Sequence, residues 1–310
     1  MGDRPAPLSV VLPVYDEREN LEPLHARLTE ALKLTGRDYE VVYVDDGSRD
    51  GSWEVLCRLA AADARVRLVR LRKNFGQTAA LAAGLDHARN PILVTLDADL
   101  QNPPEEIPRL LARLGGNVDV VGGWRVNRHD SWVRRAASWT VNRLTSVIVG
   151  VSMRDYGCML RAYRRAVVEQ IVACRESSQF IPALANTFAT SVAEVPVAHG
   201  PRRHGRSRYG LLRLLRLNFD LLTGFSLLPI QIVSLTGVLV AVLGLGFAVF
   251  LGLRRLLLGP EVEGVFTLFA ILFFFVGLQI LALGLIGEYV GRIYQEVRRR
   301  PRYVISEVLE

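Results

Sequence analysis

Two long apolar stretches near the C-terminal end constrain the fold more than any other feature of the sequence. They cover residues 225–253 and 265–287. Each is long enough to cross the ~30 Å hydrocarbon core of a bilayer as an α-helix. Hydrophobic residues make up 50% of the chain, which is a large share for a protein that is soluble throughout. The sequence therefore predicts two transmembrane helices within residues 225–290.

Arginine residues crowd both outer flanks of this apolar pair. Those before it are Arg202, Arg203, Arg206, Arg208, Arg213 and Arg216, and those after it are Arg292, Arg298, Arg299, Arg300 and Arg302. The positive-inside rule places both flanks, and with them both termini and the N-terminal domain, in the cytoplasm. Because the basic residues follow the membrane flanks, the formal net charge of +7 indicates an anionic membrane surface, and we expect no nucleic-acid partner.

Between residues 8 and 121, short β-branched runs alternate with amphipathic segments of helical length. The runs read LSVVLPVY, EVVYVDD, VRLVRL, ILVTLDAD and VDVVGG. This alternation predicts an α/β, Rossmann-like domain with a mostly parallel sheet covered by helices on both faces. Helical patterns over 132–149 and 163–174 and a strand-like run over 191–198 are expected to complete the same domain, residues 1–205.

Two further segments complete the predicted organisation. Over residues 206–224, leucines alternate with arginines, a pattern typical of an amphipathic helix that lies in the membrane interface. Residues 291–310 are expected to form a cytoplasmic C-terminal tail. The three cysteines, Cys57, Cys158 and Cys174, lack the spacing of a disulfide framework or a zinc site, so we expect reduced thiols.

Acidic residues follow two of the predicted strands, namely Asp45 and Asp46 after one and Asp97 and Asp99 after another. In sheets of this kind, ligands bind outside the carboxyl ends of the strands. In an extended segment the side chains of Asp97 and Asp99 would point to the same side and repel each other unless a cation lay between them. Mg²⁺ or Mn²⁺ fits, because such ions take one or two carboxylates together with substrate phosphates. A solvated loop is the plain alternative for an isolated D-x-D.

Taken together, LSVVLPVYDERENL, EVVYVDDGSRDGS and LDADLQ resemble the family 2 glycosyltransferases of the GT-A fold. The resemblance implies that the loops of this domain bind a nucleotide-sugar donor and a metal. The donor-binding residues it implies are Pro13, Tyr15, Glu17, Asp45, Asp46, Gly76, Asp97, Ala98 and Arg161. The metal ligands it implies are Asp97, Asp99 and Gln101. Gly76 belongs to N-F-G-Q, a turn near the donor in relatives, although an N-cap for a helix from Gln77 explains it equally well. A surface salt bridge is the alternative for Arg161.

Longer runs narrow the resemblance to the polyprenyl-phosphate glycosyltransferases. They include VGGWRVNRHDSWVRRAASWTVNRL, RDYGCMLRAYRR, ESSQFIPALANTFA and GLIGEYVGRIYQEVRRRPRY, and the likeness spans residues 8–303. The most similar branch transfers 4-deoxy-4-formamido-L-arabinose from UDP to undecaprenyl phosphate for lipid A modification and polymyxin resistance. The resemblance implies a metal-dependent, inverting enzyme of the bacterial inner membrane, assembled as a homo-oligomer, a tetramer in relatives.

The same resemblance assigns the remaining site residues. Asp155 and Asp99 are the implied catalytic residues, with Asp155 a base or an orienting group; an N-cap or an ion pair with Arg154 or Arg161 is its structural alternative. The residues implied for the acceptor phosphate are Arg125, Arg128, Arg202, Arg206, Ser207, Arg208 and Tyr209. Arg208 stands where relatives have Lys, and the guanidinium and ammonium groups differ in hydrogen-bonding geometry.

Two other functions stay open at this point. The same chemistry would serve a transferase of glucose, mannose or another hexose from UDP or GDP to a polyprenyl phosphate, because spacing does not report which hydroxyls a pocket binds. A non-catalytic membrane scaffold that binds nucleotide sugar is the alternative from another class. The complete set of Asp97, Asp99, Asp155 and the arginines weighs against the scaffold.

Overall fold

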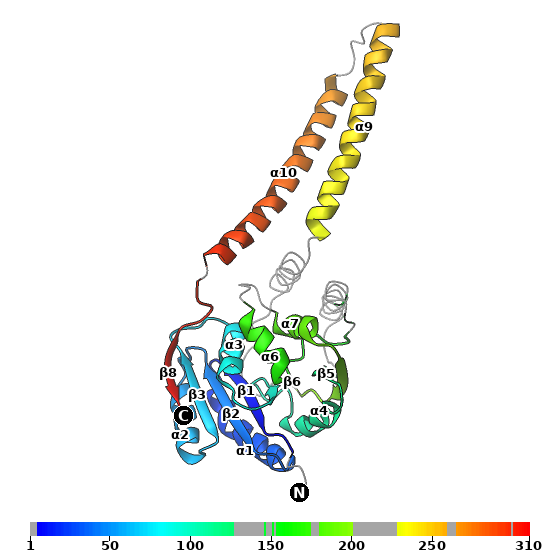
Figure 1. The fold of residues 1–310 in the computed structure, drawn as a ribbon. Coiled ribbons are helices and arrows are strands. Elements are labelled where there is room, and N and C mark those ends of the chain that lie inside the picture. The colour runs from blue at the N-terminus through cyan, green and yellow to red at the C-terminus, as the bar shows by residue number, and fades with distance from the viewer. Residues whose placement is uncertain are drawn as a thin grey trace. The chain divides into compact units, whose positions relative to one another are not determined.

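The computed structural model divides the chain into two compact units (Figure 1). The first comprises Met1–Asn218 together with Arg300–Glu310, and the second comprises Phe219–Arg299. The structure describes residues 5–126, 146, 151, 153–174, 180–200, 228–258, 265–298 and 300–310. The predicted interfacial helix over 206–224 and all but one residue of the predicted helix over 132–149 lie outside these ranges.

A mixed sheet forms the centre of the first unit. Its strands lie in the order β7-β5-β6-β4-β1-β2-β3-β8. Their bounds are β1 Leu8–Val14, β2 Tyr39–Asp45, β3 Val66–Leu71, β4 Ile92–Thr95, β5 Val120–Arg125, β6 Arg161–Arg164, β7 Val192–Val197 and β8 Ile305–Leu309. The neighbours from β4 to β3 are parallel, as are β5 and β7, whereas β6 and β8 pair antiparallel with their neighbours. The predicted α/β domain with a mostly parallel sheet is confirmed.

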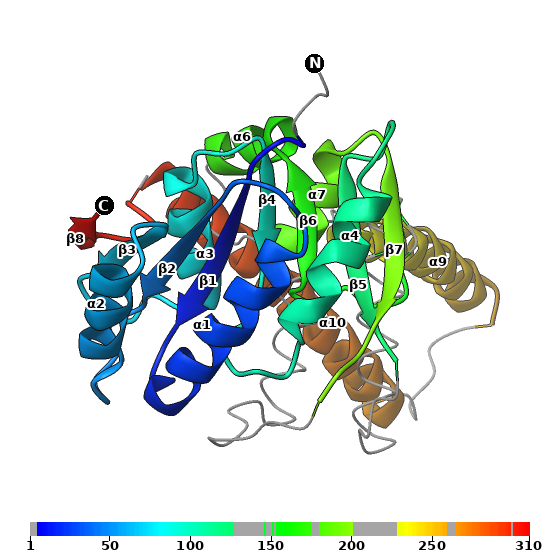
Figure 2. The same ribbon diagram turned by 90° about the horizontal axis from the view of Figure 1, so that it is seen from below.

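Helices cover both faces of this sheet (Figure 2). One face carries α1 Arg18–Lys33, α2 Ser52–Ala62 and α4 Ile107–Arg113, the last preceded by the short helix η1 Pro104–Glu106. The other face carries α3 Gln77–His87, α6 Arg165–Ala173 and α7 Ile181–Phe188.

Helix α1 follows the pattern of an amphipathic surface helix. Its buried leucines recur at helical spacing as Leu21, Leu24, Leu28 and Leu32. Helix α3 instead approaches the sheet closely, because a Cβ atom on Gly84 would lie only 2.3 Å from Cγ1 of Val11. Small residues in α3 therefore set its distance from β1.

The structure corrects two predicted elements. The segment over 163–174 is not helical from its start, because Arg161–Arg164 forms β6 and the helix begins at Arg165. Residues 291–310 are not a separate tail, because helix α10 continues to Val297 and β8 pairs with the outer edge of β3. In both cases hydrogen bonds from distant strands, rather than the local pattern, determine the strand.

The second unit consists of two long helices, α9 Leu228–Leu258 and α10 Val265–Val297. Within them, Pro229–Phe247 and Phe274–Val297 are long and apolar enough to cross a membrane, and 0% of either span is buried inside the protein. The predicted pair of long apolar helices is confirmed, with both helices extending past the predicted bounds.

Candidate active site

Most of the residues singled out in the sequence lie at one edge of the sheet. Strands β1 to β4 run in one direction, and β5 and β7 run in that direction again, because β6 between β4 and β5 is antiparallel to both. Their carboxyl ends therefore share an edge. The loops that begin there carry Glu17 after β1, Asp46 after β2, Asp99 after β4 and Arg125 at the end of β5.

Hydrogen bonds join the first two of these loops into one piece. The Asp16 amide donates to Oγ of Ser48 at 3.0 Å, and the Arg49 amide donates to Oδ1 of Asp16 at 2.9 Å. The Glu17 amide donates to Oγ of Ser52 at 3.1 Å. Asp16 adopts a positive φ of 54°, which is uncommon outside glycine and marks a sharp turn. Sequence reasoning did not single out Asp16, Ser48 or Ser52, although all three lie within the quoted motifs.

Asp45 and Asp46 are buried, with 0% and 2% of their surface exposed. The Asp46 carboxylate accepts hydrogen bonds from the amides of Phe75 at 2.7 Å and Gly76 at 2.9 Å. The Asp45 carboxylate lies 3.5 Å from Nε of Arg70. Burial raises the pKa of both carboxyl groups. The sequence predicts donor contacts for both residues, but in this structure their carboxylates serve the protein's own loops.

Glycines make the contact between the second and third loops possible. Gly47 has a φ of 70°, and a Cβ atom there would lie 2.7 Å from the backbone carbon of Lys73. Gly76 has φ 96° and ψ 157°, a conformation that only glycine adopts readily, and it is the N-cap of α3. The helix begins at Gln77 as predicted, and no side chain caps it.

The D-x-D segment lies on a turn rather than on an extended strand. Strand β4 ends at Thr95, a turn covers Ala98 and Asp99, and Leu100 has a φ of 61°. The prediction that Asp97 and Asp99 lie on an extended segment is therefore wrong. The turn still keeps both residues at the carboxyl end of β4, where Asp97 is half-buried and Asp99 is 9% exposed.

The donor atoms of this turn suit a hard divalent cation. Oδ1 of Asp97 accepts a hydrogen bond from Nε2 of Gln77 at 2.7 Å, and Oδ1 of Asp99 accepts one from the Gln101 amide at 3.1 Å. In the described part of the chain, no group of three or more His, Cys, Asp or Glu could hold a metal. Two carboxylates and the amide oxygen of Gln101 nevertheless fit Mg²⁺ or Mn²⁺, which keep waters and complete their shell with phosphates.

Asp155 forms a two-pronged ion pair with Arg125. Nε of Arg125 lies 2.6 Å from Oδ2 of Asp155, and Nη2 donates to Oδ1 at 2.9 Å. The Gly157 amide also donates to Oδ1, at 3.1 Å. Only 3% of Asp155 is exposed, whereas 18% of the Arg125 side chain remains exposed. An ion pair, predicted as the structural alternative for Asp155, is present, and the partner that the structure gives it is Arg125, which the prediction did not name.

Arg161 is fully buried, with 0% exposure. Its guanidinium donates to backbone carbonyls, at 2.9 Å to Cys158, 3.2 Å to Asp155 and 3.3 Å to Tyr156. The alternative of a surface salt bridge is wrong, because no part of the Arg161 side chain is exposed to solvent. Its buried position also gives no support to a direct contact with the nucleotide-sugar donor. The Arg161 side chain instead holds the segment that carries Asp155.

The other predicted residues divide into two groups. Pro13 lies in β1 and Tyr15 directly follows that strand, and both residues are half-buried. Ala98 is buried in the D-x-D turn. The residues outside the described ranges are Arg128, Arg202, Arg206, Ser207, Arg208 and Tyr209.

The three cysteines are free thiols, as predicted. Cys158 is buried, and that burial raises the pKa of its thiol to about 11. The thiol therefore stays protonated near neutral pH and acts as a packing group.

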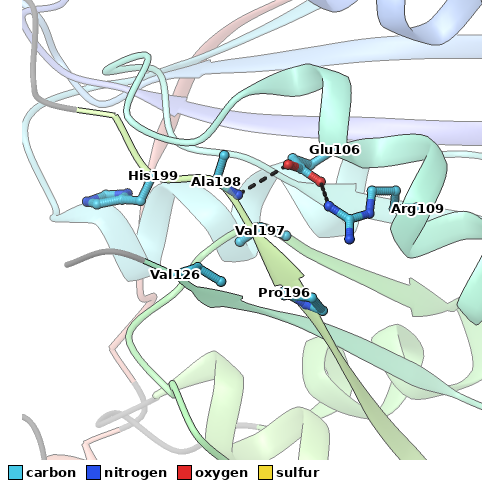
Figure 3. A pocket seen from close by; sticks show the side chains of 7 residues that line it. All are labelled: Glu106, Arg109, Val126, Pro196, Val197, Ala198 and His199. Atoms are coloured by element: carbon cyan, nitrogen blue, oxygen red, sulfur yellow. Dashed lines mark hydrogen bonds and ion pairs between the residues drawn. The ribbon is translucent and has the colours of Figure 1, made fainter.

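An open cavity of about 310 Å³ adjoins the same edge, where β5 and β7 end (Figure 3). Glu106 lies on one side of it and His199 on the other. Oε1 of Glu106 accepts a hydrogen bond from the Ala198 amide at 3.2 Å, and Oε2 accepts one from Arg109 at 2.8 Å. Glu106 thus joins the start of α4 to the end of β7.

The fold and the sequence are similar to those of known proteins. The chain is 51% identical over 305 residues to an undecaprenyl-phosphate 4-deoxy-4-formamido-L-arabinose transferase of Edwardsiella ictaluri, covering 97% of this chain and 94% of that one. It is 48% identical to the protein of the same name from Aeromonas hydrophila, with the same coverage.

Among solved structures, glucosyl-3-phosphoglycerate synthase of Mycobacterium tuberculosis matches with a TM-score of 0.53 and 20% identity, over 71% of this chain and 80% of that one. Another structure of that synthase contains Mn²⁺ and UDP. The fold match shows that the sheet domain is GT-A-like. Residues 9–172 match the family described as glycosyl transferase family 2. Because the match spans the sheet edge described above and the relatives cover nearly the whole chain, this protein belongs to glycosyl transferase family 2.

Proposed function

We propose that the protein transfers 4-deoxy-4-formamido-L-arabinose from UDP to undecaprenyl phosphate in a single inverting displacement. The observation that carries the proposal is the 51% identity to a transferase of that name over 97% of the chain. The geometry adds support, because it brings a carboxylate turn and a preorganised arginine to one edge of the sheet.

The metal-binding residues in this proposal are Asp97, Asp99 and Gln101. A bound Mg²⁺ or Mn²⁺ would neutralise charge on the diphosphate that leaves with the nucleotide. The half-burial of Asp97 leaves it accessible to such an ion, and the turn at Leu100 directs the chain away after Asp99. The contribution of the protein is to hold these oxygens at the mouth of the sheet.

The roles of Arg125 and Asp155 in this proposal follow from their ion pair. The acceptor is a phosphomonoester with a second pKa near ~6, so it is already an anionic nucleophile at neutral pH. Asp155 has both carboxylate oxygens engaged by Arg125, which suits an orienting group better than a proton acceptor. Arg125, still partly exposed, would then bind the acceptor phosphate, and positioning with charge stabilisation would supply most of the catalysis.

The membrane context belongs to the same proposal. Helices α9 and α10 would cross the bacterial inner membrane, with the sheet domain and both termini in the cytoplasm. The arginines at 202, 206 and 208 would lie near the lipid headgroups and the polyprenol phosphate. Assembly into a homo-oligomer, a tetramer by resemblance, completes the proposal.

The test is a transfer assay with the detergent-purified protein. UDP-4-deoxy-4-formamido-L-arabinose and undecaprenyl phosphate are supplied with and without EDTA, and UDP-glucose is added as a competitor. Formamido-sugar product that disappears with EDTA is the expected result. Product from UDP-glucose alone would keep the mechanism but reject the arabinose donor. No product from any UDP- or GDP-sugar would favour the scaffold.

A further inference from the structure

The C-terminal segment, residues 303–310, is built into the sheet domain although the second unit separates it from the rest of that domain in sequence. Its strand β8 covers the outer edge of β3, with Ile305 opposite Leu71 and Leu309 opposite Leu68. At the far end of this pairing, the Glu310 carboxylate accepts hydrogen bonds from Arg67 and Arg89. The segment is therefore anchored at its last residue.

The near end of the segment holds a different part of the domain. The Arg72 amide donates to the carbonyl of Val304 at 2.8 Å. The Tyr303 hydroxyl donates to Oδ2 of Asp86, on α3, at 3.3 Å. Burial and the neighbouring Asp86 raise the pKa of Tyr303 to about 12, so the hydroxyl keeps its proton. Residues 303 and 304 thus contact the first residue of the loop over residues 72–76 and helix α3, which follows that loop.

That loop, together with the first residue of α3, reaches two of the carboxylates at the sheet edge. The amides of Phe75 and Gly76 donate to Asp46, and Nε2 of Gln77 donates to Asp97. We call residues 72–77 the donor loop, because Asp46 and Asp97 belong to the proposed donor and metal sites. Hydrogen bonds therefore hold both ends of the donor loop, to Val304 at its first residue and to the two carboxylates at its last three, and the backbone of the loop connects them.

We propose that Tyr303 and Val304 are positioning residues for the donor, acting through the donor loop. The inference rests on the proposed function, because it assumes that a nucleotide-sugar donor binds at this edge. The side chains of Arg72, Lys73 and Asn74 are exposed, so the backbone bond to Val304 is a principal restraint where the loop begins. In the sequence, the same segment comes after helix α10, which ends at Val297.

Covering an edge strand is the purely structural role that the experiment has to separate from positioning. Arg72→Pro removes the amide donor and keeps Leu71 extended, as the residue before a proline prefers. Arg72→Ala is its matched control, because it removes the side chain and keeps the amide. Tyr303→Phe weakens the second contact without a backbone change, and Glu310→Ala loosens the far end of the segment only.

The readouts are the KM for the UDP-sugar, the KM for the lipid acceptor, the melting temperature and hydrogen exchange of the amides of residues 73–77. Loss of one hydrogen bond corresponds to about a threefold to tenfold change in a binding constant. We expect Arg72→Pro to raise the donor KM by about that factor, with the acceptor KM unchanged and exchange in the donor loop faster. We expect a smaller change of the same kind in Tyr303→Phe, and none in Arg72→Ala. Glu310→Ala is expected to lower the melting temperature alone.

Equal donor KM and equal exchange in Arg72→Pro and Arg72→Ala would overturn the inference. If Arg72→Pro fails to fold, Tyr303→Phe takes its place as the test. An unchanged donor KM together with unchanged hydrogen exchange in Tyr303→Phe would then overturn the inference. The exchange measurement needs no substrate. A wild-type protein that transfers no sugar would therefore defeat the proposed function, while the exchange in the donor loop would still report whether residues 303 and 304 restrain it.

Discussion

Two pairs of aspartates follow the two strands that flank β1, and the structure treats them differently. Asp45 and Asp46, after β2, are 0% and 2% exposed, and their carboxylates are engaged by Arg70 and by the amides of Phe75 and Gly76. Asp97, after β4, is only half-buried. Aspartates at the same edge of one sheet can therefore be enclosed by donors of the protein or stay partly exposed to solvent.

The difference has a local cause in each pair. After β2, Gly47 lets the backbone of residues 73 and 74 approach within van der Waals contact, and this brings two amides to Asp46. After β4, Leu100 turns the chain so that Asp99 accepts a hydrogen bond from its own turn, at the Gln101 amide. Backbone donors of another loop thus bind Asp46, whereas Asp99 accepts a hydrogen bond from the backbone of its own turn.

The largest effect should come from Asp99→Ala. Removal of a proposed metal ligand should lower transferase activity by roughly 100- to 1000-fold, because charge on the leaving diphosphate is no longer stabilised. The fold should persist, since the hydrogen bond that the Asp99 carboxylate accepts from the Gln101 amide is local to its own turn. Turnover and circular dichroism of the purified variant provide the check, and wild-type turnover would contradict the metal assignment.

Asp155→Asn extends the comparison to a carboxylate that an arginine engages. The neutral amide cannot hold Arg125 through two charged oxygens, so we expect activity to fall by about 10- to 100-fold, mainly through the KM for the lipid acceptor. The control is Arg154→Ala, which removes a neighbouring arginine and keeps both Arg125 and Asp155. A loss confined to kcat, with a changed pH profile, would instead make Asp155 the base.

Asp46→Ala should separate the two aspartate pairs by stability. It leaves the partly buried amides of Phe75 and Gly76 without their acceptor, and the free energy of unfolding should fall by about 1–3 kcal/mol. Asp97→Ala, the matched variant in the other pair, should change stability much less, because Gln77, which donates to Asp97, is exposed to solvent. Chemical denaturation of both variants measures the difference, and equal losses would remove the distinction between the pairs.

The smallest effect concerns the charge on Asp45. Burial raises the pKa of its carboxyl group in the folded state, so the folded protein binds this proton more tightly than the unfolded chain does. The stability that this bound proton contributes is therefore lost as the pH rises from the ordinary pKa of an aspartate through the higher pKa of Asp45 in the folded protein. Asp45→Asn should melt higher than the wild type at pH 7, and the gap should narrow as the pH falls toward 4. A gap that widens on acidification would contradict this sign.

The sequence predicts a strand well where the residues of that strand are themselves hydrophobic. It predicts a strand poorly where the strand forms only because neighbouring strands supply hydrogen bonds. The run over 66–71 matches β3 residue for residue, because its valines and leucines carry the pattern themselves. Strand β6, of sequence RAYR, has no such pattern, and it forms because β4 and β5 supply hydrogen bonds on both sides. Strand β8 lies beyond the apolar helices and depends in the same way on the free edge of β3.

The sequence by itself determined the two apolar helices, the alternating α/β domain and the set of residues at the carboxyl edge of its sheet. These follow from local composition and from the common direction of parallel strands, which brings their ends to one edge. Only the tertiary structure decided the partners: Asp46 with Phe75 and Gly76, Asp155 with Arg125, and β8 with β3. Each of these contacts joins residues distant in sequence, and their pairing depends on how strands and loops pack in three dimensions.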